Sequence, residues 1–117
     1  MNNIEKLFKA DLVSECTPEQ IVDWYLARCR RAIELKLKKV NFMIILKAGG
    51  IYYCLVGAYN IKLDTNTKII DCECLDFIHR GLKLLNTEYS WAVSCKHSLY
   101  AKLMLQKLIK TIDELNN

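Results

Sequence analysis

Apolar residues recur at helical spacing through residues 17–40 and predict the longest helix of the N-terminal half. Thr17 suits the N-cap, Pro18 the first helical position, and Gln20 completes a capping box with Thr17. We expect one broad face of this helix to pack on the core. That face comprises Ile21, Val22, Tyr25, Leu26, Cys29, Ala32, Ile33, Leu37 and Val40.

Beyond this helix the pattern changes to short apolar or alternating runs that predict strands. Residues 42–46 and 51–56 flank Gly49-Gly50, which indicates a β-hairpin. Both runs are apolar on both faces, which predicts that they lie in the middle of the fold. Residues 59–63 and 68–74 alternate on either side of a turn and predict two further antiparallel strands.

The C-terminal part returns to helical spacing. It predicts helices over residues 75–85 and 98–115, the first weakened by Gly81 and ended by Asn86, the second capped by Ser98. Residues 88–95 suit either a strand or an extended connection.

With a short helix over residues 2–13, these elements predict an α+β fold. Three to five antiparallel strands would form a small sheet, packed against the long helix of the N-terminal half and a C-terminal helix. The length of 117 residues suits a single domain, residues 1–117.

Composition adds an expectation about partners. The hydrophobic content of 52% is high for a monomer of this size, so we expect an interface with a partner or with a second copy in a homodimer. The net charge of +4 favours acidic partners, either an acidic protein surface or nucleic acid. No run is long enough to span a membrane and no signal-peptide core follows the charged start, so we expect a cytoplasmic location and reduced cysteines.

One surface hypothesis concerns the predicted long helix. Trp24, Arg28, Arg31 and Leu35 follow one another at helical spacing on the side opposite the expected core face, and Lys38 adds charge nearby. Arginine and tryptophan are enriched at binding hot spots. This pattern predicts a non-enzymatic binding or regulatory protein that engages an acidic partner, such as a small inhibitor encoded by a phage, virus or mobile element. The alternative is a solvated helix face on which Trp24 and Leu35 pack under the short helix expected over residues 2–13.

A second hypothesis is a Cys/His metal site or a thiol enzyme. Cys72 and Cys74 are two residues apart, as are Cys95 and His97, so each pair would share one face of a strand. Together they could form a Cys₃His zinc site, with His79 as a further ligand. The competing interpretation is that these cysteines are buried as small hydrophobic residues.

A third hypothesis is a homodimer that binds a small ligand between aromatic walls formed by Tyr52, Tyr53 and Trp91. The alternative is that these aromatic residues belong to the core. The chain contains no P-loop, GxGxxG or GxSxG motif, so the sequence favours a protein that is not an enzyme.

Overall fold

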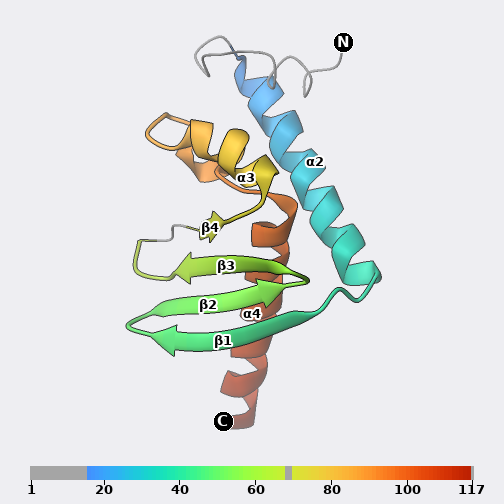
Figure 1. The fold of residues 1–117 in the computed structure, drawn as a ribbon, viewed down its shortest axis with the longest axis vertical. Coiled ribbons are helices and arrows are strands. Elements are labelled where there is room, and N and C mark those ends of the chain that lie inside the picture. The colour runs from blue at the N-terminus through green and yellow to red at the C-terminus, as the bar shows by residue number, and fades with distance from the viewer. Residues whose placement is uncertain (1–15, 68–69, 117) are drawn as a thin grey trace.

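The structure is a computed structural model that describes residues 16–67 and 70–116 (Figure 1). The helix expected over residues 2–13 lies outside this part. The described elements, in chain order, are α2 (Pro18–Leu37), β1 (Phe42–Ala48), β2 (Ile51–Val56), β3 (Tyr59–Asp64), β4 (Ile70–Cys72), α3 (Leu75–His79), the 3₁₀ turns η2 (Gly81–Leu84) and η3 (Ser90–Ala92), and α4 (Lys96–Asn116).

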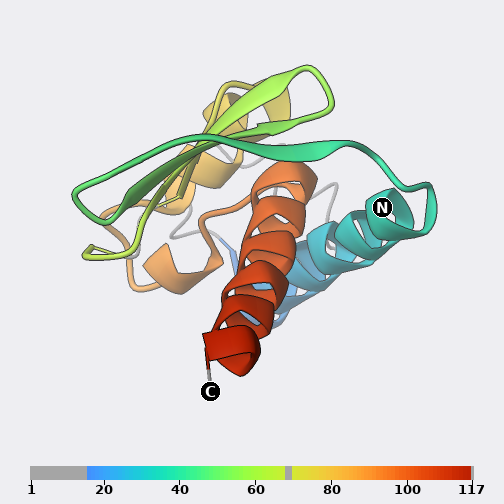
Figure 2. The same ribbon diagram turned by 90° about the horizontal axis from the view of Figure 1, so that it is seen from below.

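The strands form one antiparallel sheet in the order β1-β2-β3-β4. Gly49 and Gly50 join β1 to β2 with φ angles of 59° and 81°, a backbone region that glycine adopts at low cost. Helices α2 and α4 lie on the same side of the sheet (Figure 2). The predicted α+β fold, with an antiparallel sheet against two long helices, is confirmed.

The predicted start of α2 is also confirmed. The Gln20 amide donates to Thr17 Oγ1 at 3.2 Å, and the Thr17 amide donates to Gln20 Oε1 at 2.8 Å. Pro18 occupies the first turn, where its missing N–H leaves no hydrogen bond unmade. The helix ends at Leu37, and the chain turns at Lys39 with a φ of 54°.

The predicted core face of α2 is confirmed at Ile21 and Ala32 but wrong at several other positions. The buried residues are Ile21, Trp24, Arg28 and Ala32. Four members of the expected core face are instead exposed: Val22, Leu26, Ile33 and Leu37. Helix α2 is therefore rotated about its axis from the orientation that apolar periodicity alone predicts.

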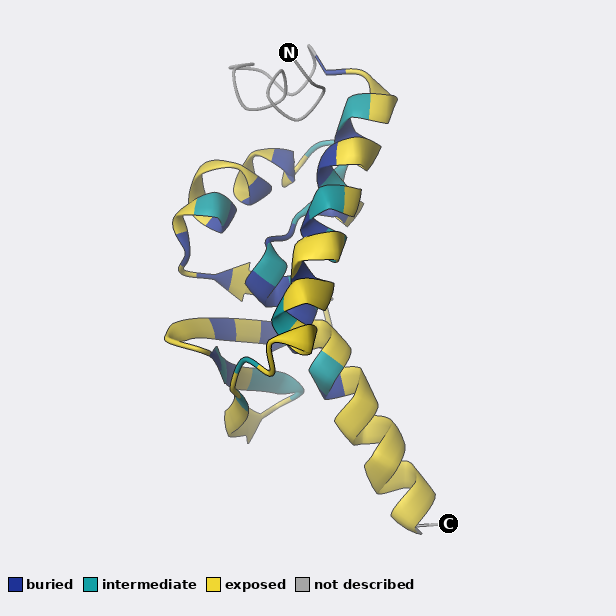
Figure 3. Cartoon of the chain, turned by 90° about the vertical axis from the view of Figure 1, so that its right-hand side faces the viewer, coloured by how far each residue is buried: buried dark blue, intermediate teal, exposed yellow. Residues whose placement is uncertain are grey.

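Strand β1 does not lie in the middle of the fold, contrary to the prediction. It is an edge strand, and most of its residues are exposed, including Met43 and Ile45. The C-terminal half of α4 likewise projects beyond the sheet and is exposed (Figure 3). The main core lies between β2, β3, β4 and the N-terminal half of α4.

The helix predicted over residues 75–85 is divided in two. Helix α3 stops at His79, and Gly81 begins a separate 3₁₀ turn. A Cβ atom on Gly81 would lie 2.6 Å from the Ser94 carbonyl oxygen, so the glycine permits close approach of these two segments. Asn86 has a φ of 66°, the left-handed conformation expected of it.

Residues 88–95 form no strand. They contain the short 3₁₀ turn η3, followed by a connection that leads into α4. No helix in the described ranges combines the length and the apolar character needed to cross a membrane.

Candidate metal centre

The four residues of the sequence-predicted metal site come together in the fold. Cys72 ends β4, Cys74 precedes α3, Cys95 precedes α4, and His97 is in the first turn of α4. The three sulfur atoms and one imidazole nitrogen all lie within 4.8 Å of one another. All four residues are buried, with at most 9% of each exposed.

Extended backbone brings Cys72 and Cys74 to the same side. Cys74 has φ −71° and ψ 154°, so the chain stays extended past the end of β4. The intervening Glu73 points away, where its Oε1 accepts hydrogen bonds from the Asn60 amide at 2.8 Å and from Asn60 Nδ2 at 3.1 Å. This alternation is the geometry that the sequence predicts for the first pair.

A helix start, not a strand, positions the second pair. The Ser98 amide donates to Cys95 Sγ at 3.3 Å, and the Cys95 amide donates to Ser98 Oγ at 2.9 Å. These reciprocal bonds have the form of a capping box with Cys95 at the N-cap. The predicted cap Ser98 is therefore its partner within the first turn, and the expected strand geometry for Cys95 and His97 is wrong.

The imidazole of His97 is fixed by packing. Its ring stacks on Tyr59, with centroids 4.3 Å apart and an interplanar angle of 29°. Its Nδ1 is buried and has no hydrogen-bond partner among the described residues. A buried nitrogen without a hydrogen-bond partner lowers the stability of the fold. A metal ion bound beside the ring would change the hydrogen bonding of its nitrogen atoms.

Hydrogen bonding among the thiols separates their acidities. Hydrogen bonds from Cys72 and then from Cys95 lower the pKa of Cys74, and the Phe77 amide adds a bond to its sulfur at 3.4 Å. The same bond to Cys74 raises the pKa of Cys72, with further increases from Cys95 and from burial. For Cys95 the bond with Cys72 lowers the pKa, but the bond with Cys74 and burial outweigh it, which gives a value of about 11. Cys74 is therefore the first of the three to become a thiolate.

The spacing of the four ligand atoms fits a tetrahedral metal ion. With zinc–sulfur bonds of about 2.3 Å, the ligands of a regular tetrahedral site are separated by roughly 3.8 Å. The observed upper limit of 4.8 Å requires only a small contraction around the ion. Three thiolates and one imidazole are also a donor set that zinc prefers.

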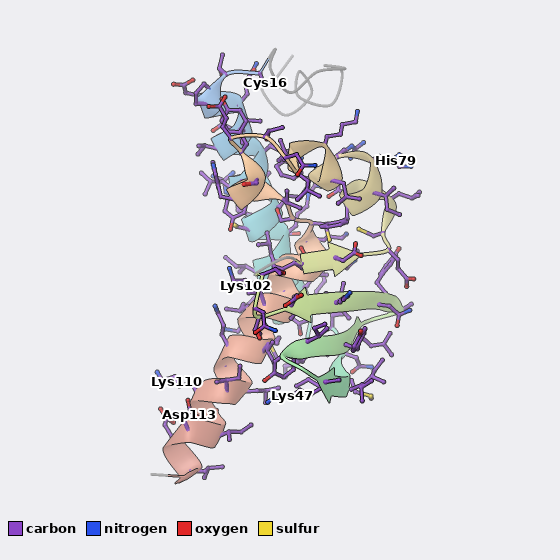
Figure 4. All side chains as sticks on the ribbon, turned by 90° about the vertical axis from the view of Figure 1, so that its left-hand side faces the viewer. Cys16, Lys47, His79, Lys102, Lys110 and Asp113 are labelled. Atoms are coloured by element: carbon purple, nitrogen blue, oxygen red, sulfur yellow. The ribbon has the colours of Figure 1, made fainter. Side chains whose placement is uncertain are left out.

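The other predicted ligand, His79, does not join this cluster. It is exposed at the end of α3, at the outer edge of the molecule (Figure 4). Cys29 and Cys54 are free thiols outside the cluster, as are the three cysteines within it. The structure therefore places four ligands together and excludes the fifth.

The predicted exposed stripe on α2 is only partly exposed. Arg31 and Lys38 face solvent, but Trp24 and Arg28 are each 0% exposed, and Leu35 packs against the main core. The prediction that Trp24 and Arg28 are available on the surface is wrong. Trp24 is buried in a cluster that includes Ile21, Leu84 and Ala92, whereas Arg28 is paired with a carboxylate on α3.

The partner of Arg28 is Asp76, a residue that the sequence did not identify as a contact of α2. Its carboxylate forms a two-point ion pair with Arg28, with Nε to Oδ2 at 2.7 Å and Nη2 to Oδ1 at 3.0 Å. Arg80 also contacts Asp76 at 3.1 Å, and the Arg28 guanidinium carbon lies 5.2 Å from the centre of the Trp24 ring. Burial lowers the pKa of Arg28, and Asp76 opposes this effect.

The aromatic walls of the predicted ligand site do not meet. Tyr52 packs against the main core, whereas the neighbouring Tyr53 lies on the opposite face of β2. Trp91 instead contacts Tyr25 on α2, with ring centroids 5.5 Å apart. This arrangement does not form the ligand groove that the sequence suggested.

Comparison of the chain with protein-family models, curated proteins and solved structures gave no match. The support for the candidate metal centre therefore comes from the geometry of its four residues.

Proposed function

We propose that this protein binds one zinc ion through Cys72, Cys74, Cys95 and His97, and that the ion stabilises the fold. The observation that carries this proposal is the convergence of four buried ligand atoms from separate elements within 4.8 Å. Four protein ligands complete a tetrahedral zinc site, which is typical of structural zinc. Catalytic zinc needs an open position for water or substrate.

The positions of the ligands along the chain explain what the ion would stabilise. Cys72 and Cys74 precede residues 75–94, whereas Cys95 and His97 follow them. A bound ion would thus join β4 and the start of α3 to the start of α4. Because the unfolded chain has no preformed site, the binding free energy would contribute directly to folding.

Burial of the three sulfur atoms argues against a thiol enzyme. Cys72, Cys74 and Cys95 are 3%, 5% and 0% exposed, so a substrate would have no direct approach to a sulfur nucleophile. A zinc-stabilised binding or regulatory domain in a reducing compartment such as the cytoplasm suits these features. Under this proposal the exposed Arg31 and Lys38 remain candidate contacts for an acidic partner, whether protein or nucleic acid.

Metal content and ligand substitution test the zinc proposal. Protein purified with a reductant and reconstituted with zinc should hold one equivalent after desalting. X-ray absorption should give zinc–sulfur distances of about 2.3 Å and a zinc–nitrogen distance of about 2.0 Å. Cobalt substitution should give the visible absorption of a tetrahedral thiolate site.

Cys54 supplies a matched control because it is a buried thiol outside the cluster. Cys54→Ala should retain one equivalent of zinc, whereas Cys95→Ala and His97→Ala should each lower the affinity at least tenfold. Folded wild-type protein that retains less than a tenth of an equivalent would refute the proposal. It would leave the cluster as hydrogen-bonded buried thiols.

A further inference from the structure

The described residues contain two hydrophobic clusters, and the three cysteines of the candidate metal centre belong to the larger one. The main core joins the sheet and α4, and it includes Cys72, Cys74 and Cys95. A second, smaller cluster joins the N-terminal half of α2 to Leu84 and Ala92. Both of these last residues belong to residues 75–94, here named the cap.

The cap covers the N-terminal half of α2. It packs Leu84 and Ala92 near Trp24 and Ile21, and it contributes Asp76 to the ion pair with Arg28. In Figure 1 the cap segments lie beside the upper part of α2, away from the sheet. The cap therefore covers the face of α2 that carries Trp24 and Arg28.

The C-terminal half of α2 is held independently of the cap. Ala32 and Leu35 pack with the main core, and Tyr100 on α4 donates a hydrogen bond to the Val40 carbonyl at 2.6 Å. Helix α2 can thus stay attached to α4 when the cap moves. This separation makes local opening of the cap physically distinct from global unfolding.

Closure of the cap over α2 carries a free-energy cost from the burial of polar groups. It buries the Arg28 guanidinium completely, and it leaves Trp24 Nε1 buried with no hydrogen-bond partner in the described part of the chain. Burial of a charge or of an unpaired N–H opposes closure. Within the cap, only the five residues of α3 form an α-helix, so its own regular structure offers little compensation.

We propose that metal binding locks the cap over α2, and that loss of the metal releases the cap and uncovers the Trp24–Arg28 face while the sheet remains folded. This inference rests on the proposed zinc site, because the four ligands bracket the cap at both ends. The ion holds these ends together and removes much of the chain entropy that opposes closure.

The face uncovered in this way has a defined chemistry. It presents an indole ring and a guanidinium group 5.2 Å apart, next to the exposed Arg31. In the closed state the guanidinium is occupied by the carboxylate of Asp76. The cap thus acts as an intramolecular acidic ligand, and its release makes this face available for a carboxylate-bearing partner.

Hydrogen exchange with and without metal tests whether the ion holds the cap closed over α2. Zinc-loaded protein is compared with the same protein after removal of zinc by a chelator and then after zinc is restored. Metal removal should speed amide exchange in the cap and in the N-terminal half of α2 at least tenfold. Exchange in β2 and β3 should change less than threefold, and added zinc should reverse the effect.

Fluorescence gives a second measurement on a Trp91→Phe background, in which Trp24 is the remaining tryptophan. Metal removal should shift Trp24 emission to longer wavelength and increase its quenching by acrylamide. Asp76→Asn should bind one equivalent of zinc yet show part of this change in the loaded state, because it keeps all four ligands and loses the carboxylate charge. The exposed-pair variant Arg80→Gln should behave like the parent protein.

The possible results distinguish the proposal that zinc binds from the proposal that zinc holds the cap closed. If no zinc binds, both proposals fail. If zinc binds but its removal leaves cap exchange and Trp24 emission unchanged, the metal site stands and the lock is wrong. Equal loss of protection in the cap, β2 and β3 would also overturn the lock, because the metal would then stabilise the whole fold as one unit.

Discussion

Substitution of Asp76 tests whether the buried ion pair holds α3 against α2. Asp76→Asn keeps the shape of the side chain but removes the carboxylate charge that faces the Arg28 guanidinium, which is 0% exposed. Removing one partner of a buried pair costs about 3–5 kcal/mol. Because the Asp76 side chain is itself 23% exposed, we expect about 3 kcal/mol, at the lower end of this range.

Urea unfolding of the zinc-saturated protein provides the assay. With a typical m value of about 1.5 kcal/mol/M, a loss of about 3 kcal/mol lowers the midpoint by about 2 M. Arg80→Gln breaks the exposed contact with Asp76 and should cost about 0.5 kcal/mol or less. Combining Arg28→Met with Asp76→Asn should recover part of the loss, since no buried charge then remains.

A loss of less than about 1 kcal/mol for Asp76→Asn at unchanged m value, as for an exposed ion pair, would refute the role of the Arg28–Asp76 pair in holding α3 against α2. Additive effects of Arg28→Met and Asp76→Asn would refute it as well. Additivity would mean that the two side chains contribute independently to stability.

Three further predictions concern packing, pH and the orientation of α2. Gly81→Ala should weaken zinc binding at least tenfold, as measured by competition with a chelator, because its Cβ would lie 2.6 Å from the Ser94 carbonyl oxygen. Burial raises the pKa of Cys54 from about 9 to about 11. Its contribution to the free energy of unfolding should therefore be complete below pH 9 and be lost as pH rises towards 11, by up to about 3 kcal/mol. In urea unfolding, Ile33→Lys should change stability by less than about 0.5 kcal/mol, whereas Ile21→Ala should cost about 2–5 kcal/mol.

Each of these predictions has a distinct contrary result. Unaltered zinc affinity in Gly81→Ala would show that the segment before Cys95 adjusts without moving the ligand. The pH prediction is contradicted if Cys54→Ala retains the same loss of stability between pH 9 and 11. A large loss from Ile33→Lys would indicate that the outward face of α2 contributes to the core after all.

The sequence predicted helix starts, turns and left-handed residues correctly where these features depend on residues close together in the chain. The capping box of α2, the Gly49-Gly50 hairpin and the left-handed Asn86 all depend on neighbours in the sequence. The burial of Arg28 on α2 instead involves Asp76, which is 48 residues away in the sequence. Apolar periodicity cannot detect such a pair, because it treats a buried arginine as a solvent-facing residue.

The metal cluster shows both the strength and the limit of spacing arguments. The pairing of Cys72 with Cys74 follows from extended backbone, and the structure retains that geometry. Cys95 and His97 meet the first pair through the start of α4, where the chain is helical. The sequence identified the four residues, but the meeting of two distant segments required the tertiary fold.

The placement of the four ligands also makes the cap an inserted segment with closely spaced ends. Its two ends carry side chains whose ligand atoms lie within 4.8 Å, so the cap leaves and rejoins the sheet and α4 at one place. Loops with closely spaced ends tolerate replacement when few other contacts are lost. The cap does not meet this condition, because Phe77 packs in the main core and Asp76 pairs with Arg28. A replacement linker between Cys74 and Cys95 would keep the four ligands but would also have to supply the core packing of Phe77.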